Sequence, residues 1–326
     1  MKFSVRDGMI SAKSLSDKLS LLERIGYDGI ELTGREDISG KIEEIKRIIP
    51  SYKLHVSTLS GYVGDLLSPN VADRELAISD IKRRLSWASQ LGARGLIVVP
   101  TFGPAKIPDL TPLASSRELE LSLLVDELKD LSKTANDYGV KIILEPLNRY
   151  ETHLINTLSD AYKVSERAGE GVTIMADFFH MNIEEQDMAK AIRENFSRIY
   201  HVHLADSNRL EPGAGHTDFA PGIKVLLELG YNGYLTLECG FSKDQETSLR
   251  DALRFVKGLV RRWQTSAAFL KRPLIGHRVK ANMPGSKPCQ HDTYIPLFTK
   301  FALDPSVKAL DAVDLDRTDK KTEMAL

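Results

Sequence analysis

Four ionisable residues lie at or near the ends of four short apolar runs in the second half of the chain. They are Glu145, Asp177, His203 and Glu238. The runs are short and rich in β-branched and aliphatic residues, which predicts buried strands. An ionisable side chain at the end of a buried strand is costly unless a partner lies nearby. Because three carboxylates at close range repel one another unless a cation lies among them, the pattern predicts a divalent-cation site.

The types of donor narrow the choice of ion. Three carboxylates and one imidazole, with no thiolate, favour Mn²⁺, Co²⁺ or Mg²⁺ and favour Zn²⁺ less. His201 and His203 share one face of their predicted strand, because side chains on a strand alternate with a period of two. We interpret His201 as a hydrogen-bonded core histidine and His203 as the ligand.

Two of these carboxylates could also move protons. A divalent ion polarises a sugar carbonyl and the adjacent hydroxyl, and it stabilises an enediolate. Glu145 and Glu238 end the fifth and eighth predicted strands, so they could approach a sugar from opposite faces. Removal of a proton on one face and its return on the other inverts the carbon. We therefore predict that Glu145 and Glu238 form a catalytic acid/base pair.

Other side chains near these strand ends are candidates for binding a substrate. Glu151 can accept a hydrogen bond from a hydroxyl, His180 can donate one to a carbonyl oxygen, and Arg209 offers a fixed charge. No cluster of lysine and arginine residues stands at the strand ends, so an unphosphorylated sugar is expected.

Aromatic and glycine-rich segments have two interpretations each. Tyr62, Phe102 and Phe179 could form a platform for the C–H faces of a sugar, although such residues more often serve packing. The loop 212–215 either lets the backbone approach a ligand or is an ordinary turn. The sequence alone leaves both questions open.

The elements that must position these residues alternate between strands and helices. Strands are predicted at 2–5, 28–32, 53–59 and 95–100 and around Ile142, Thr173, Tyr200 and Tyr234, and helices at 15–25, 40–49, 71–91, 117–138, 158–168, 184–195, 221–229 and 248–263. Strands that alternate with amphipathic helices favour a parallel sheet with helices outside it. Eight such units favour an α/β fold of the closed (β/α)8 TIM-barrel type. An open doubly wound sheet is the alternative, but the first strand–helix turn lacks a glycine-rich phosphate loop.

The pattern divides the chain into two parts. Residues 1–264 form the predicted barrel, and residues 265–326 form a C-terminal extension without a sustained period. The extension is either partly disordered or packed at a subunit contact.

Composition excludes several classes of protein. The chain has 326 residues, two cysteines and a formal net charge of −1. The near-neutral charge disfavours a nucleic-acid-binding protein, and two cysteines provide no disulfide framework. The N-terminus is too polar for a signal peptide, and no apolar run is long enough to span a membrane. We therefore expect a cytoplasmic protein.

Four segments carry a family resemblance: 145–151 (EPLNRYE), 177–185 (DFFHMNIEE), 201–203 (HVH) and 208–215 (NRLEPGAG). They resemble the sugar isomerase/epimerase superfamily of xylose-isomerase-like barrels, and within it most closely the ketose 3-epimerases that act on D-tagatose, D-psicose or L-ribulose. The resemblance implies that Glu145, Asp177, His203 and Glu238 hold Mn²⁺ or Co²⁺ and that the two glutamates form the acid/base pair. It also implies that Glu151, His180 and Arg209 bind the C1–C3 end of the sugar.

The resemblance implies inversion of C3 of an unphosphorylated ketose through a metal-bound enediolate. An alternative is a metal-dependent lyase that cleaves 3-oxo-glycosides by the same enolisation followed by elimination. The first reading suits a homo-dimer or homo-tetramer, and the second suits a hetero-oligomer with a small β-rich subunit. A DNA-repair endonuclease on this fold needs further histidines at strand ends, and the fourth strand ends at Thr101 without one. A non-catalytic sugar-binding barrel would be expected to lack one of the metal ligands.

Overall fold

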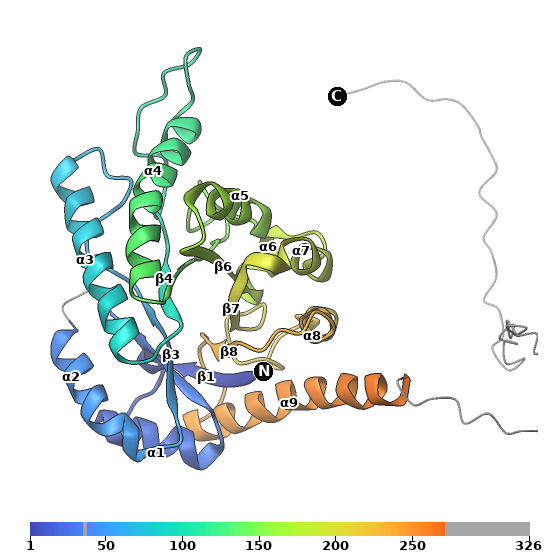
Figure 1. Ribbon diagram of the computed structural model, residues 1–326. Coiled ribbons are helices and arrows are strands. Elements are labelled where there is room, and N and C mark those ends of the chain that lie inside the picture. The colour runs from blue at the N-terminus through green and yellow to red at the C-terminus, as the bar shows by residue number, and fades with distance from the viewer. Residues whose placement is uncertain (35–37, 271–326) are drawn as a thin grey trace, which may run out of the picture. The chain divides into compact units, whose positions relative to one another are not determined.

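The computed structural model, which describes residues 1–34 and 38–270, is a closed barrel of parallel strands surrounded by helices (Figure 1). The strands are β1 (Lys2–Arg6), β2 (Gly29–Thr33), β3 (His55–Ser60), β4 (Gly95–Val98), β5 (Lys141–Leu144), β6 (Val172–Asp177), β7 (Ile199–Leu204) and β8 (Tyr234–Leu237). Each strand pairs with the next along the chain, and β8 pairs with β1. The predicted (β/α)8 fold is confirmed.

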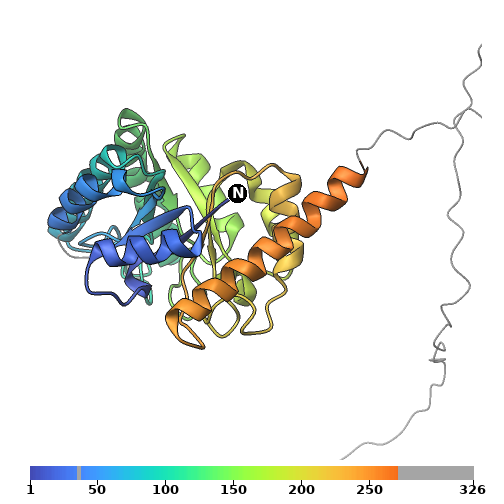
Figure 2. The same ribbon diagram turned by 90° about the horizontal axis from the view of Figure 1, so that it is seen from below.

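Helices follow the strands and cover the outside of the barrel (Figures 1 and 2). The α-helices are α1 (Leu15–Ile25), α2 (Ser39–Ile48), α3 (Val71–Gln90), α4 (Ser116–Asp137), α5 (Leu158–Ala168), α6 (Phe178–Glu184), α7 (Met188–Asn195), α8 (Phe219–Glu228) and α9 (Gln245–Leu270), and the short 3-10 helices are η1 (Asp7–Met9), η2 (Ile49–Ser51) and η3 (Phe196–Arg198). The long helix α9 packs against both α8 and α1, so the last helix lies next to the first.

Local sequence explains where several helices begin and end. The Ser14 side chain accepts a hydrogen bond from a backbone N–H of the first turn of α1, and Gly26 ends that helix in the left-handed conformation at φ 98°. Ser115 and Thr157 begin α4 and α5 with capping boxes, in which each side chain and an acidic residue three positions later bond reciprocally to backbone N–H groups.

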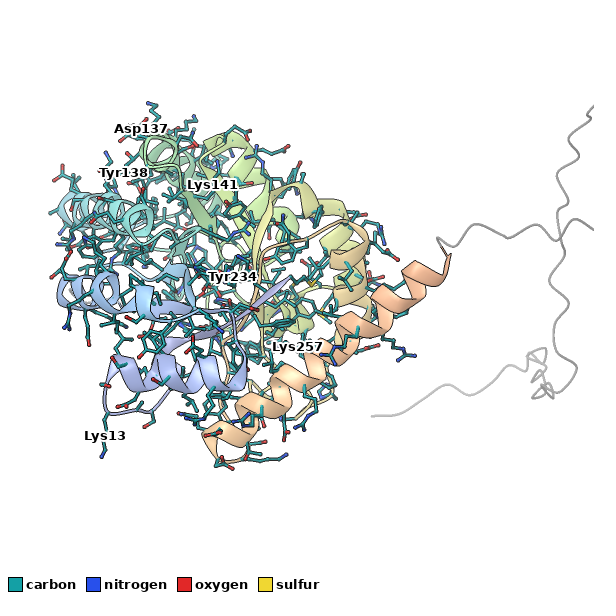
Figure 3. The ribbon with its side chains drawn as sticks, turned by 60° about the horizontal axis from the view of Figure 1, so that its bottom comes forward. Lys13, Asp137, Tyr138, Lys141, Tyr234 and Lys257 are labelled. Carbon is teal, nitrogen blue, oxygen red and sulfur yellow. The ribbon has the colours of Figure 1, made fainter. Side chains whose placement is uncertain are left out.

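Side chains alternate between the outer core and the inside of the barrel. On β4, the side chains of Leu96 and Val98 belong to the main core, which the helices complete, whereas Ile97 lines the cavity of the barrel. Ile97 also forms a small separate apolar cluster with Ile143 and Met175. Lys141 and Tyr234, which are labelled in Figure 3, are the first residues of β5 and β8. They therefore mark the ends of these strands opposite to Glu145 and Glu238.

The structure differs from the sequence-based expectation in two helices. The predicted helix 184–195 begins only at Met188, as α7, and a separate short helix that was not predicted, α6, precedes it directly after β6. The final helix runs through Leu270 instead of ending at Trp263, so helical backbone continues past the predicted barrel boundary at 264. The rest of the predicted extension, 271–326, lies outside the described residues, and the expected oligomer stays a prediction. Among the helices in the described part of the chain, none is both long and apolar enough to cross a membrane.

Candidate active site

The barrel brings the four predicted ligands together at the C-terminal ends of neighbouring strands. Asp177 is the last residue of β6, His203 lies in β7, and Glu145 and Glu238 directly follow β5 and β8. One donor atom from each residue lies within 4.8 Å of the donor atoms of the other three. Donors bound to one small divalent ion lie up to about 4 Å apart across it. The four side chains therefore need only a small inward movement to share an ion.

His203 lies at the centre of this cluster. Its Nδ1 atom is 2.9 Å from Oε2 of Glu238, 3.6 Å from Oδ2 of Asp177 and 3.7 Å from Oε1 of Glu145. Three carboxylates thus surround one ring nitrogen. Together they form a set of oxygen and nitrogen donors that contains no sulfur. Such a set fits a hard or borderline divalent ion.

Asp177 divides its two carboxylate oxygens between two tasks. Oδ1 accepts hydrogen bonds from the backbone N–H groups of Phe179, at 2.7 Å, and His180, at 3.2 Å, and so caps α6. Oδ2 faces Nδ1 of His203. The neighbouring imidazoles hold the pKa of Asp177 below its usual range, although burial by itself would raise it. Asp177 is therefore a fixed, ionised donor.

A buried carboxylate on β2 binds the other side of His203. Oε2 of Glu31 lies 3.0 Å from Nε2 of His203 and 3.1 Å from Nε2 of His201, and it accepts a hydrogen bond from the hydroxyl of Thr58 at 2.7 Å. Thr236 also bonds to Nε2 of His201. The contact between Glu31 and Nε2 of His203 fixes the ring so that Nδ1 faces the carboxylate cluster. A carboxylate in this position commonly orients metal-binding histidines.

Burial and neighbouring charges shift the pKa values of Glu31 and His203 in opposite directions. Burial would raise the pKa of Glu31, but His203 and His201 hold it well below its usual range. Burial likewise opposes a charged His203, but Glu31 and the surrounding carboxylates raise its pKa well above the usual value. His201 is different, because burial lowers its pKa more than Glu31 raises it. A neutral, hydrogen-bonded His201 agrees with its interpretation as a core histidine.

Replacing Glu31 by glutamine is expected to weaken the binding of Mn²⁺ about 10–100-fold, because loss of a carboxylate behind a metal-binding histidine reduces its basicity and loosens its orientation. Isothermal titration calorimetry of the metal-free protein with Mn²⁺ measures this change. Glu127→Gln is the matched control, since Glu127 is a carboxylate on α4 that pairs with Arg74 outside the barrel. Equal Mn²⁺ affinity in the Glu31 variant and the control would contradict a role for Glu31.

Two arginines that are far apart in the sequence hold Glu238. Arg6, the last residue of β1, forms an ion pair with Oε1 of Glu238, and its Nε atom lies 3.8 Å from Oε1 of Glu31. Nη2 of Arg209 lies 3.8 Å from Oε2 of Glu238. Glu238 therefore has a defined position even without an ion.

His180 has a defined tautomer. The backbone N–H of Asn148 donates to Nδ1 of His180 at 3.1 Å, so Nδ1 is an acceptor and the proton must lie on Nε2. Nε2 is buried and has no hydrogen-bond partner in the described part of the protein. It lies 3.9 Å from Oδ2 of Asp177. His180 therefore offers an N–H donor beside the carboxylate cluster.

Glu151 and Arg209 form the next layer of the site. Nη1 of Arg209 donates to Oε1 of Glu151 at 3.1 Å, and the Asn148 side chain donates to the same oxygen at 2.9 Å. The Arg209 guanidinium stacks on Phe179 with 4.5 Å to the ring centroid. Arg209 has φ 58°, a left-handed conformation that residues with side chains rarely adopt and that often occurs at functional sites.

A cavity of about 670 Å³ opens above the cluster, within the range of small-molecule sites. Its walls include Glu145, Glu238, Glu151, His180 and Arg209, which are all of the predicted catalytic and substrate-binding residues. Asp177 and His203 lie beneath it, at 2% and 0% exposure. The arrangement gives a sugar-sized space lined by three glutamates, one histidine and two arginines, Arg6 and Arg209.

The loop 212–215 is an ordinary turn, the second of its two predicted interpretations. The N–H of Gly213 donates to Oδ2 of Asp206, and a Cβ atom on Gly215 would approach Oδ1 of Asp206 to 2.3 Å. The loop therefore wraps around Asp206 and does not line the cavity. Tyr62 and Phe102 do line it, whereas Phe179 supports Arg209.

Sequence reasoning missed three residues of this site. Arg6, Glu31 and Asn148 were not singled out, although each carried a signal. Glu31 is a charge within an apolar strand, Arg6 is a charge at a strand end, and Asn148 lies inside the EPLNRYE segment. The partners of Arg6 and Glu31 are far away in the sequence, so the local pattern gave no reason to connect them. Asn148 bonds to the nearby Glu151, but its bond to His180 spans 32 residues.

The chain is similar to known proteins along most of its length. Residues 19–259 match the family described as Xylose isomerase-like TIM barrel. Over 262 residues the chain is 32% identical to 3-dehydro-D-guloside 4-epimerase of Escherichia coli K12, which covers 79% of this chain and 99% of that protein. It is 29% identical over 249 residues to an L-ribulose 3-epimerase of Mesorhizobium japonicum, covering 74% and 82%. The apo crystal structure of a 3-keto-D-glucoside 4-epimerase from E. coli has a TM-score of 0.71 at 32% identity, covering 79% and 99%.

Proposed function

Because the chain belongs to the Xylose isomerase-like TIM barrel family, we propose that it is a metal-dependent epimerase that inverts a carbon next to the ketone of an unphosphorylated sugar. The observation that carries this proposal is the placement of Glu145 and Glu238, which come from different strands, share one ionisable cluster and both face the cavity. The names of its similar proteins support an isomerase or epimerase.

Glu145, Asp177, His203 and Glu238 are the residues that would hold the ion, and we propose Mn²⁺ first, with Co²⁺ or Mg²⁺ as alternatives. When bound, a divalent ion would supply positive charge beside the sugar carbonyl and so make the neighbouring C–H group more acidic. Each carboxylate has two oxygens, so one oxygen of a glutamate can face the ion while the other reaches the sugar.

The two glutamates divide the proton transfers between the two faces of the sugar. The carboxylate of one takes the proton from the carbon next to the ketone, and the electron pair of that C–H bond moves toward the carbonyl oxygen. The carboxylic acid of the other then returns a proton to the opposite face, and the carbon is inverted. Exchange with water restores the starting protonation of both groups.

The remaining polar side chains orient the sugar. The N–H of His180 at Nε2 can donate to the oxygen on which negative charge develops, because its tautomer is fixed by Asn148. Glu151 and Arg209 hold each other at 3.1 Å and can bind neighbouring hydroxyl groups as acceptor and donor. Holding the reacting carbon between Glu145 and Glu238 is the main contribution of these contacts.

Incubation of the Mn²⁺-loaded protein in deuterated water with a panel of free ketoses and 3-oxo-glycosides tests the proposal. NMR should show deuterium at the inverted carbon, which is C3 of a ketose or C4 of a 3-oxo-glycoside. Release of the aglycone would identify elimination, the lyase reaction, in place of epimerisation. The absence of exchange with every compound would overturn the proposed function.

A further inference from the structure

The cavity extends beyond the residues that the proposed reaction uses. Its far wall is formed by two loops, one after β3 and one after β4, which contribute Tyr62, Asp65, Phe102 and Lys106. We call these four residues the distal wall. None of them belongs to the ionisable cluster, and no step proposed above uses them.

We propose that the distal wall is a second subsite, which binds a neutral hydroxylated ring attached to the reacting sugar, so that the substrate is a 3-oxo-disaccharide. This inference rests on the proposed function and names its substrate class. The cavity volume of about 670 Å³ is more than a single sugar ring needs, and it leaves space beside the ring that contacts Glu145 and Glu238.

The chemistry of the distal wall matches a sugar ring. Asp65 and Lys106 form an ion pair at the cavity surface, and both side chains are 28% exposed. Together they offer hydrogen-bond acceptors and donors without net charge, which suits hydroxyl groups and disfavours an anionic substituent. Phe102 is 39% exposed and adds an apolar ring, against which the C–H face of a sugar can pack.

The loop that carries Phe102 and Lys106 is anchored, so the subsite exists before a ligand binds. The buried carboxylate of Glu120 accepts the backbone N–H of Lys106 at 2.6 Å and also pairs with Nε2 of His153. Nδ1 of His153 in turn lies 2.8 Å from the carbonyl oxygen of Gly103.

The same loop is tied to the substrate-binding segment after β5. The N–H of Gly103 donates to the carbonyl oxygen of Glu151 at 2.8 Å, and Gly103 forms a parallel bridge with Thr152. On the other loop, the Tyr62 hydroxyl donates to the carbonyl oxygen of Val99 at 2.9 Å, which fixes its ring. Preorganised walls of this kind bind without the entropic cost of ordering a loop.

Deuterium exchange of two substrates tests the subsite in the full-length, Mn²⁺-loaded protein. The probes are the 3-oxo derivative of methyl glucoside, which lacks a second ring, and the 3-oxo derivative of a glucose disaccharide. For the unmodified protein, kcat/KM should be at least about tenfold higher for the disaccharide, with the difference mainly in KM, because a second ring adds binding energy of this order. Equal values for the two probes would overturn the inference.

Variants then assign the difference to the distal wall. Phe102→Ala and Lys106→Met should each reduce the ratio of the two kcat/KM values at least about threefold. Leu110→Ala is the matched control, since Leu110 is 52% exposed in the same loop and does not line the cavity. An unchanged ratio in Phe102→Ala and Lys106→Met would contradict the subsite, and calorimetric titration with Mn²⁺ establishes that each variant retains its fold and site.

The result separates this inference from the proposed function. Exchange that is equally fast with both probes, or that occurs only with free ketoses, overturns the subsite and leaves the epimerase intact. The absence of exchange with every sugar overturns both.

Discussion

Glu238→Gln is expected to reduce the rate of epimerisation by at least about 10²–10⁴-fold, the usual contribution of a general acid or base. Glutamine keeps the size of the side chain and can still contact Arg6, but its amide neither takes nor returns a proton. The same substitution removes one anionic donor from the cluster, so Mn²⁺ binding should also weaken. Glu145→Gln should have an effect of the same order.

Isotope exchange distinguishes a two-base mechanism from a general loss of the site. A variant that retains one carboxylate can still remove and return a proton on that face of the sugar. At saturating Mn²⁺, each single variant should therefore incorporate deuterium into one epimer without inverting it, and the two variants should act on opposite epimers. Glu246→Gln, at a surface position on α9 paired with Arg24, is the control and should resemble the unmodified protein. A near-normal rate of inversion in either variant would show that the acid/base assignment is wrong.

Removal of divalent ions is expected to abolish turnover, by about 10³-fold or more, because an ion next to a carbonyl contributes several kcal/mol to the stabilisation of developing negative charge. The test is activity after dialysis against EDTA, followed by titration with Mn²⁺, Co²⁺ and Mg²⁺. Mn²⁺ should restore the rate most completely.

Metal removal should affect the site more than the fold. The apolar core between the strands and helices does not include the cluster, so circular dichroism of the metal-free protein should remain that of a folded barrel. The melting temperature should rise when Mn²⁺ is added, since an ion that binds only the folded state stabilises it. Full turnover in protein shown by elemental analysis to be metal-free would refute a metal-dependent reaction.

The convergence of Glu145, Asp177, His203 and Glu238 could be predicted because it follows from topology. Parallel strands of a barrel present their C-terminal ends on one side, so ionisable residues at the ends of consecutive strands must approach one another. The helices could be predicted for a different reason, since their periodicity and their caps are local properties of the sequence.

Interactions across the barrel could not be predicted in this way. Glu31 on β2 meets His201 and His203 on β7, and these strands are not neighbours in the sheet. Their contact depends on which side chains point inward and on the width of the interior, and neither is visible in the sequence. The helix α6 could not be predicted because it has only seven residues, too few for a periodic pattern. Its N-cap, Asp177, serves both roles, since Oδ1 caps the helix and Oδ2 faces His203.

The pairing of β8 with β1 has a consequence for biosynthesis. The ribosome makes Arg6 long before Glu238, and the two side chains meet only when the last strand pairs with the first. A nascent chain that has emerged through β7 carries Glu145, Asp177 and His203 but lacks Glu238, the second of the two proposed proton carriers. Under the proposed mechanism such a chain cannot invert a sugar carbon, so activity would begin only when the barrel is closed.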